Sequence, residues 1–282
     1  MSLKNSKLFA MAVAAVAAAA FSYSSCRVYS EVQANKKLLF ETNYAIYDKN
    51  AYISSAKVFL YGESHLLYEK EISLLLKHYV KDGDVILFEG MAVRQDYSFL
   101  LGKSRSIDDI EKELGKNAGI EDRINAYAKY TPKLYEIKDK NVKILGMESR
   151  VARSMALEYG WACGKLEEKI KSGKASKEDE ENLAKLSKKR DEWARILDEC
   201  FYDYIRIVLG ENPGAGVHVI DLGRKHVAPI AAGLKKFKIN FVAFVPLTDK
   251  ATPEFAKEYE EAADKMMGFD EKTMEELLKA EK

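Results

Sequence analysis

Five short apolar runs recur along the chain and alternate with segments of helical spacing. Each run is apolar on successive residues, which is typical of strands buried on both faces of a sheet. Such strands separated by helices indicate a parallel or mixed sheet covered on both sides. The sequence therefore predicts an α/β fold with a mixed, mainly parallel central sheet and helices on both faces, its strands at 57–61, 85–90, 142–149, 217–223 and 239–246.

The segments between the runs predict helices of different kinds. Residues 65–80 carry a broad stripe of leucine and isoleucine at helical spacing, residues 94–140 form a mixed, tyrosine-containing helical region, and residues 226–238 follow the fourth run as another helix. Each of these segments is long enough to connect two parallel strands across a face of the sheet.

A charge-laced insertion at about 160–210 separates the third and fourth strands. Its break at Ser172 and Gly173 predicts a helical hairpin, stabilised partly by ion pairs between residues four apart. The hairpin is either a lid or partner surface or simply a solvated face. The tail from Thr252 has the pattern of two acidic amphipathic helices, which suit packing or a homodimer contact.

The first 26 residues differ from the rest. Lys4 and Lys7 precede an uncharged, alanine-rich run over 8–23, and small polar residues lead to Cys26. This layout is typical of a secretory signal. The run is short for a bilayer span, which needs roughly 20 apolar residues. We expect an exported, extracytoplasmic protein, and signal cleavage, an N-terminal membrane anchor and lipidation of Cys26 all stay open. The sequence then predicts a linker and the start of a domain at 27–56, and one α/β domain over 57–282.

Composition narrows the class of protein. The 282 residues are 47% hydrophobic and 32% charged, which suffices for the core of a large globular domain. With 45 basic and 44 acidic residues, the chain lacks the charge expected of a nucleic-acid-binding protein. Cys163 and Cys200 form either a disulfide or two buried thiols.

The most specific pattern is a Gly-x-x-His spacing that occurs twice in a chain with four histidines. Gly62 and His65 follow the first apolar run, and Gly223 and His226 follow the fourth. Because ligands bind outside the carboxyl ends of strands in open α/β sheets, both histidines are expected to face one crevice. Each glycine is expected to allow a sharp turn and to leave space for a ligand or ion.

Charged residues follow the other strands at the same edge. Glu89 ends the second run, and Glu148 and Arg150 end the third. Two imidazoles and a carboxylate are a usual ligand set for a catalytic divalent ion, so we predict that His65, Glu89 and His226 bind a metal. The alternative is that the two histidines are capping residues.

Neighbouring side chains are candidates for the remaining chemistry. Glu63 can move protons, although strand alternation can also turn it away from His65. Arg150 can hold a substrate carboxylate or a developing oxyanion, and Glu148 either takes part or only neutralises Arg150. His78 and His218 are expected to lie at the surface and in the structural core, respectively.

Several of these segments together resemble a known family. "YGESH", "LFEG", "ILGMESRVARS", "KKRDEWARIL" and "DLGRKHVAPI" occur in the order found in the TraB/PrgY/Tiki (GumN) group and its relative ChaN. The first motif is most similar to ChaN-like and erythromycin-esterase-like members, and the last is closer to the TraB form. Pro229 stands where that form usually has glycine, and Glu148 stands for an aspartate. The likeness spans roughly residues 57–246.

This resemblance implies a metal-dependent hydrolase of peptidase or esterase type, with a zinc-, manganese- or cobalt-type ion. ChaN-like members imply haem binding instead, and PrgY implies binding of peptide signals without catalysis. Carried over to this chain, His65, Glu89 and His226 form the core site, with Glu63 and Arg150 beside them. Arg190 and Asp191 are placed on a helix with the arginine toward the crevice. The alternative for that pair is the end of a solvated charge run.

Overall fold

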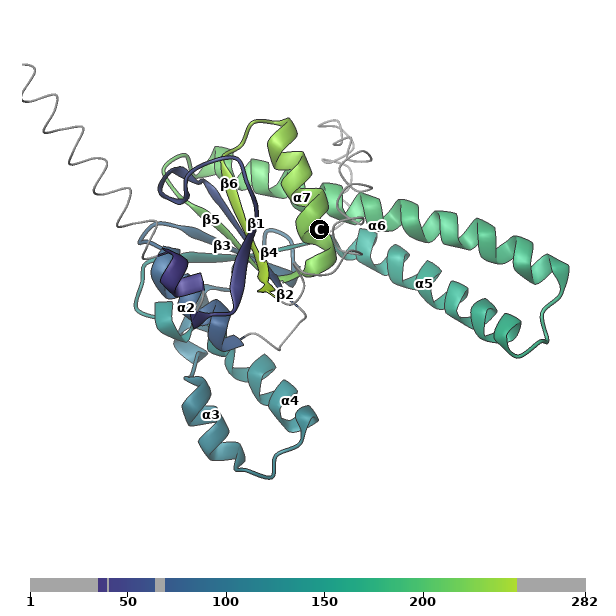
Figure 1. Cartoon of the computed structure of the whole chain (residues 1–282), viewed down its shortest axis with the longest axis horizontal. Helices are drawn as coiled ribbons and strands as arrows, with labels where there is room; N and C mark the ends of the chain where they lie inside the picture. Colours follow the sequence, from purple (N-terminus) through teal and green to yellow (C-terminus); the bar gives the residue numbers. More distant parts are fainter. Residues whose placement is uncertain (1–34, 40, 64–68, 248–282) are drawn as a thin grey trace, which may run out of the picture. The chain divides into compact units, whose positions relative to one another are not determined.

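The computed structural model describes residues 35–39, 41–63 and 69–247 (Figure 1). The chain divides into two units, Met1–Tyr44 and Ala45–Lys282. The fold and the site described below belong to the second unit. The predicted N-terminal signal, His65 and the two predicted C-terminal helices all lie outside the described residues.

A six-stranded mixed, mostly parallel sheet forms the centre, in the order β1-β6-β2-β5-β3-β4. The pairs β6/β2, β2/β5, β5/β3 and β3/β4 are all parallel. The predicted α/β class is therefore confirmed. The strands are β1 (Tyr44–Lys49), β2 (Val58–Glu63), β3 (Val85–Ala92), β4 (Lys143–Glu148), β5 (Val217–Gly223) and β6 (Phe241–Pro246).

The five predicted strands are all present, and β1 is an addition. It lies in the stretch 27–56, for which the sequence predicts a linker and the start of the domain but no strand. Its sequence, YAIYDK, has no continuous apolar run, because most of its residues are only half-buried at the edge of the sheet.

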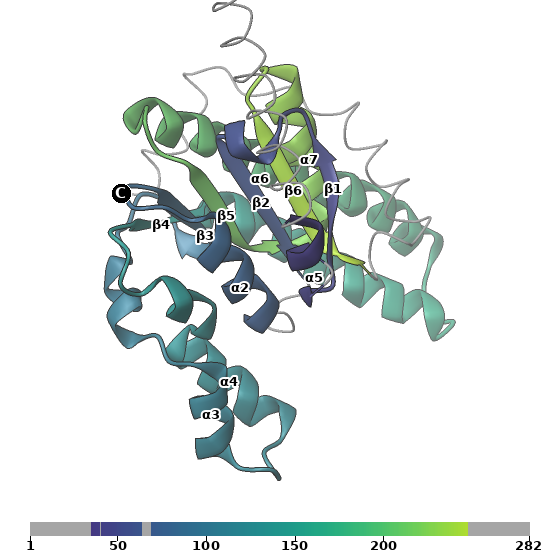
Figure 2. The ribbon, with the colours of Figure 1, turned by 60° about the vertical axis from the view of Figure 1, so that its left-hand side comes forward.

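Helices cover both faces of the sheet (Figure 1, Figure 2). The α-helices are α2 (Glu69–Tyr79), α3 (Ile107–Leu114), α4 (Ile120–Tyr130), α5 (Arg150–Lys171), α6 (Lys177–Glu211) and α7 (Arg224–Lys236). Short 3-10 helices are η1 (Ile53–Ser55), η2 (Ser98–Lys103) and η3 (Pro132–Ile137). In both views α2 and α7 lie on opposite sides of the sheet.

Strand alternation divides the core between the two faces. Val58 and Leu60 of β2 join a cluster with Phe201 of α6 and Val227 of α7. Phe59, the residue between them, points the other way and stacks on His218 at 4.6 Å. On that second face Tyr61, Tyr79 of α2 and Phe244 continue the aromatic stack. Along β2, even-numbered residues therefore point to one face of the sheet and odd-numbered residues to the other.

The predicted helical hairpin is the α5–α6 pair, and it is longer than the insertion expected at 160–210. It begins at Arg150 and ends at Glu211, with the turn at the predicted break. Cys163 and Cys200 are both buried and free, so of the two alternatives the structure has the buried thiols. The end of α6 from Leu197 to Val208 supplies core residues, whereas most of α5 is not buried.

The outer edge of β4 is covered by the segment that follows β3. Tyr97 N–H donates to the carbonyl of Ile144 at 2.8 Å, and Gly146 N–H donates to the carbonyl of Gln95 at 3.1 Å. The chain passes so close that a Cβ on Gly146 would lie 2.1 Å from the carbonyl oxygen of Ala92. Only glycine fits at this position.

Candidate functional site

The site lies at the carboxyl ends of the strands, where the strand order reverses. From β2 the chain crosses through α2 to β3, and from β5 it crosses through α7 to β6, in the opposite direction along the sheet. Because these two connections leave on opposite faces, a crevice is expected outside the ends of β2 and β5. Two groups of charged side chains lie at this edge, one toward each face.

The first group, which we call the imidazole cluster, consists of His226, Glu89, Asp198, Glu148 and Arg153. His226 stands in the first turn of α7, and its Nδ1 hydrogen-bonds to Asp198 of α6. Its Nε2 lies 3.7 Å from Oε1 of Glu89. The edge of the imidazole ring meets Phe201 at a centroid distance of 5.3 Å. The imidazole thus lies between two carboxylates, with 23% of its side chain exposed.

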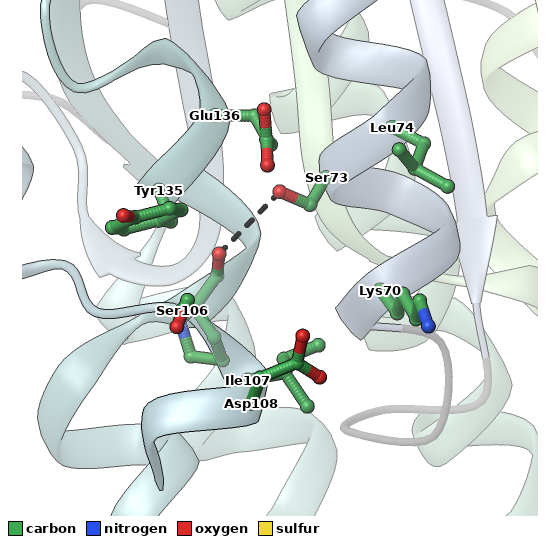
Figure 3. A pocket seen from close by; sticks show the side chains of 9 residues that line it. Lys70, Ser73, Leu74, Ser106, Ile107, Asp108, Tyr135 and Glu136 are labelled. Carbon is green, nitrogen blue, oxygen red and sulfur yellow. Dashed lines mark hydrogen bonds between the residues drawn. The ribbon is translucent and has the colours of Figure 1, made fainter.

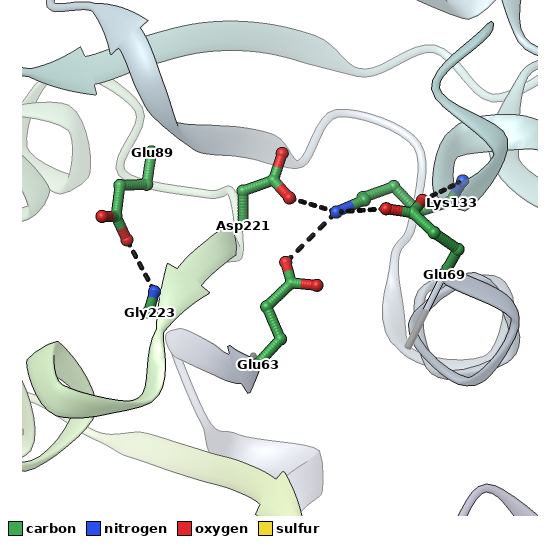
Figure 4. Close-up of polar contacts among 6 residues, drawn as sticks. All are labelled: Glu63, Glu69, Glu89, Lys133, Asp221 and Gly223. Carbon is green, nitrogen blue, oxygen red and sulfur yellow. Dashed lines mark hydrogen bonds and ion pairs between the residues drawn. The ribbon is translucent and has the colours of Figure 1, made fainter. Parts of the chain in front are cut away.

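Glu89 is held in place by the second Gly-x-x-His motif itself. Its Oε2 accepts a hydrogen bond of 2.7 Å from the backbone N–H of Gly223 (Figure 4). Val85 and Leu87 of β3 point toward α6 and α7, so Glu89, with the same parity, points to the face from which His226 comes. The strand and the start of α7 together fix both side chains.

The charge around His226 favours its protonated form. Burial lowers the pKa of the imidazole, but the hydrogen bond that Nδ1–H donates to Asp198 and the charges of Asp198, Glu89 and Glu148 outweigh burial and raise the pKa to about 9. Burial in turn raises the pKa of Asp198, partly offset by His226. A metal that bound Nε2 would therefore displace a proton, and its binding would weaken as the pH falls.

Arg153, rather than Arg150, pairs with Glu148. Its Nη1 contacts Oε2 of Glu148, while Arg150 is exposed. The reason is helical geometry, because Ser149 caps α5 by accepting the N–H of Ala152, and Arg150 is the first helical residue. Arg153, one turn later, returns over the strand end. The alternative in which Glu148 only neutralises Arg150 is therefore not what the structure has, because Arg153 takes that place.

The second group, which we call the lysine cluster, lies toward α2 and consists of Lys133, Glu63, Glu69 and Asp221 (Figure 4). The ammonium of Lys133, on η3, lies 3.1 Å from Glu63 Oε1 and 3.0 Å from Glu69 Oε1, and it also contacts Asp221 Oδ1. Lys133 is 2% exposed, Glu63 0% and Glu69 3%. A buried ammonium surrounded by three carboxylates is costly to desolvate and is retained only with such close partners.

Asp221 reaches this cluster because the strand is irregular there. Val217 and Val219 of β5 face α6 and α7, and regular alternation would turn residue 221 the same way. The register with β2 instead shifts between Leu60 and Gly62, so that Leu222 takes the inward place. Asp221 itself has a φ of 56°, a left-handed conformation that is uncommon outside glycine, asparagine and aspartate. The bulge therefore aims Asp221 at Lys133 at a cost in backbone strain.

The protonation of the lysine cluster follows from its excess of acid. Burial raises the pKa of Glu63 well above its usual value, and the charges of Asp221 and Glu69 add to this, although Lys133 opposes it. Burial likewise raises the pKa of Glu69. For Lys133, burial alone lowers the pKa, but the three carboxylates outweigh it and raise the pKa. The three acids thus keep the lysine charged despite its burial.

The three carboxylates of the lysine cluster can hold a metal ion. Each offers one oxygen, and these oxygens lie within 4.8 Å of one another. They form a ligand set of hard oxygens, which suits magnesium, calcium or manganese better than zinc. The ammonium of Lys133 lies among the same oxygens.

Glycine in the first Gly-x-x-His motif serves packing. A Cβ on Gly62 would lie 2.6 Å from Cγ2 of Val227 and 3.2 Å from Cγ1 of Val245. The missing side chain therefore makes space for α7 rather than for a ligand, contrary to our expectation from the sequence.

The two remaining histidines lie outside both clusters. His218 is fully buried, with Nδ1 3.0 Å from the hydroxyl of Tyr61 and Nε2 3.1 Å from Oδ2 of Asp84. A neutral ring with its proton on Nε2 satisfies both partners, which makes His218 structural, as expected. His78 is exposed in the last turn of α2, also as expected.

A pocket between α2, η3 and the start of α3 is separate from the imidazole cluster (Figure 3). Its wall includes Lys70, Ser73, Asp108, Tyr135 and Glu136. The hydroxyl of Ser73 donates to the carbonyl of Pro132 across it at 3.5 Å. No histidine or cysteine lines it, and its polar lining consists of lysine, serine, tyrosine and carboxylate side chains.

The structure thus brings together only part of the predicted site. Glu89 and His226 meet, whereas Glu63 belongs to the lysine cluster. Arg190 pairs with its neighbour Asp191, and 40% of its side chain is exposed. Cys163 and Glu167 of α5 lie near it, so Arg190 belongs to the hairpin. The acid that α6 supplies is Asp198, two turns after Asp191.

No protein-family model, curated protein or solved structure matches the chain. The likeness to the TraB/PrgY/Tiki group therefore stays a prediction. Within the part of the chain that the structure describes, no helix is both long and apolar enough to cross a membrane.

Proposed function

We propose that the chain is a metal-dependent hydrolase whose ion is bound by His226 and Glu89. One observation carries this proposal: Nε2 of His226 faces Oε1 of Glu89 at 3.7 Å, while Nδ1 is engaged by Asp198. An imidazole between a facing carboxylate and a supporting one is the usual arrangement of a metal-bound histidine.

The distance and the ligand types fit an ion of the zinc, manganese or cobalt class. Two ligands with bonds of roughly 2 Å cannot lie more than about 4 Å apart, and 3.7 Å satisfies this limit. A mixed nitrogen and oxygen set favours these metals over calcium or magnesium. His65, which follows Glu63 in the other Gly-x-x-His motif, is the proposed third ligand.

A divalent ion supplies a Lewis acid and lowers the pKa of a water molecule toward neutrality. The protein's own residues orient this chemistry. Asp198 holds Nδ1 so that Nε2 turns to Glu89, and Gly223 N–H fixes the carboxylate of Glu89. Phe201 shields one edge of the imidazole from water. Arg153 neutralises Glu148 beside them.

The proposed substrate is an amide or ester bond in a peptide or small molecule. Arg150 is exposed at the start of α5, directly after the strand end that carries Glu148, and is suited to bind an anionic group of the substrate. Export and tethering through residues 1–26 remain part of this proposal, as does a homodimer. Haem binding and peptide-signal binding are the alternatives implied by the resemblance.

Metal analysis of purified variants tests the proposal. We expect bound zinc, manganese or cobalt in the wild-type protein after dialysis, and its loss in His226→Ala and Glu89→Gln. His78→Ala is the matched control, because His78 is exposed on α2 and lies outside the cluster. The ion should also restore hydrolysis of a peptide or ester library after chelation. Unchanged metal content in the His226→Ala, Glu89→Gln double variant would refute the proposal.

A further inference from the structure

The ammonium of Lys133 occupies a position where a metal cation would be expected. Three carboxylates from separate elements converge on it: Glu63 from the end of β2, Glu69 from the start of α2 and Asp221 from the bulge in β5. Two of the three distances are 3.1 and 3.0 Å. These are close ion pairs in a region from which solvent is almost excluded, where charge interactions are screened little.

The backbone and the neighbouring side chains around Lys133 hold its ammonium in this position. Lys133 follows Pro132, which begins η3, and Thr131, whose φ of 40° is left-handed. The backbone N–H of Lys133 donates to Oε2 of Glu69, so the same residue is held at both of its ends. The ring of Phe88 forms an apolar wall 5.7 Å from the ammonium. A flexible surface lysine would have none of these restraints.

The carboxylates are arranged as for an ion. One oxygen from each of Glu63, Glu69 and Asp221 lies within 4.8 Å of the others, which is the spacing of oxygens around a bound divalent cation. Oε2 of Glu63 is buried and has no hydrogen-bond partner among the described residues. The three carboxylates thus have more acceptor capacity than one ammonium satisfies.

We infer that Lys133 is a resident cation, whose ammonium takes the place that a divalent ion would occupy among Glu63, Glu69 and Asp221. The lysine cluster then has the geometry of a metal site but needs no metal in the native protein. Lys133 is a positioning residue: it ties the end of β2, the start of α2 and the bulge of β5 to one point. This inference does not rest on the proposed hydrolase activity.

Replacement of the ammonium by an uncharged side chain tests the inference. Lys133→Met keeps much of the length and removes the charge. In a His226→Ala background, which removes the proposed zinc-type ligand, this variant should gain one Mn²⁺ per chain, measured by electron paramagnetic resonance at pH 8. Its thermal unfolding midpoint should rise with Mn²⁺ or Ca²⁺ concentration, whereas that of the background protein should not. Adding Glu63→Gln should abolish the gain.

Two further variants control for charge and for folding. Lys133→Arg keeps a cation and should gain no Mn²⁺. If Lys133→Met does not fold without ions, the double variant Lys133→Met, Glu69→Gln carries one acid fewer and should still bind Mn²⁺ through Glu63 and Asp221. Absence of Mn²⁺ binding by both methionine variants would overturn the inference. So would Mn²⁺ binding by the protein with Lys133 intact that Glu63→Gln removes. Failure of the proposed hydrolase would leave these outcomes unchanged.

Discussion

The two charged clusters lie at the same edge of one sheet and differ in what neutralises their carboxylates. In the imidazole cluster the basic group is a ring nitrogen of His226 with 23% of the side chain exposed. In the lysine cluster it is an ammonium that is 2% exposed and contacts three acids. A metal ion that binds a histidine can displace its proton, whereas a lysine among carboxylates keeps its charge.

The number of acids at a strand edge does not identify a ligand site. The lysine cluster has the larger set of converging oxygens, but its central position is taken by the protein's own cation. In the imidazole cluster His226 and Glu89 face each other, and 23% of the His226 side chain is exposed. Which cluster can bind a metal and a substrate therefore depends on whether its basic group is exposed to solvent and can give up its proton.

The largest expected effect comes from removing the buried ammonium. In metal-free buffer, Lys133→Met should lower the free energy of unfolding by about 3–5 kcal/mol, because it leaves buried carboxylates without their partner. Urea denaturation measures this loss. Lys138→Met, at an exposed position five residues later, is the control and should change stability by less than about 0.5 kcal/mol. A similar small change in both variants would contradict the buried lysine cluster.

The next largest loss of stability is expected at Gly62, the residue before Glu63 of the lysine cluster. Gly62→Ala should cost about 1–3 kcal/mol, because its Cβ would press on Val227 at 2.6 Å. Gly160→Ala on α5 is the matched substitution, since nothing lies within 4 Å of a Cβ there. It should stabilise the helix by up to about 1 kcal/mol. Urea denaturation of the two variants should therefore give changes of opposite sign.

In the imidazole cluster the support of the histidine can be removed without touching the proposed ligands. Asp198→Asn should weaken metal affinity by about 10- to 100-fold, because the carboxylate that orients His226 is lost. Titration with a competing chelator measures this. Asp191→Asn, two turns earlier on α6 and 69% exposed at its side chain, should leave affinity unchanged. Equal affinity in both variants would show that Asp198 does not support a metal ligand.

The smallest effect tests the histidine that belongs to neither cluster. Burial lowers the pKa of His218 below 6.5 in the folded protein, although Asp84 partly opposes this. The unfolded chain therefore binds more protons below pH 6.5, and the free energy of unfolding should fall as the pH drops from 6.5, by at most about 1.4 kcal/mol per pH unit. His218→Gln should remove this slope in urea denaturation at pH 7.5 and 5.5. An unchanged slope would assign it to other groups.

The sequence predicted the sheet well because its buried strands are continuous apolar runs. It missed β1, whose half-buried residues show no such run. It also predicted that Glu89 and His226 meet, because both follow strands whose carboxyl ends share an edge. Asp198 could not be singled out, since it is one acid among many on a charged helix and lies 28 residues from its partner.

The lysine cluster was beyond sequence reasoning for a related reason. Lys133 is one of 45 basic residues, in a region without periodicity that would mark it. The sequence could not place Asp221 in this cluster, because regular strand alternation would point its side chain to the opposite face of the sheet. The bulge in β5 and the left-handed backbone of Asp221 bring its carboxylate to Lys133. No pattern of residue types in the sequence predicts these two backbone features.

The covered edge of β4 limits how a peptide can approach the imidazole cluster. The backbone groups that Ile144 and Gly146 turn outward already pair with residues 94–98, and the carbonyl of Glu148 accepts the N–H of Val93. An extended peptide therefore finds no free row of donors and acceptors beside β4 and cannot join the sheet there as a further strand. Under the proposed function, a peptide substrate of Glu89 and His226 would lie across the strand ends, where side chains rather than backbone hydrogen bonds select it.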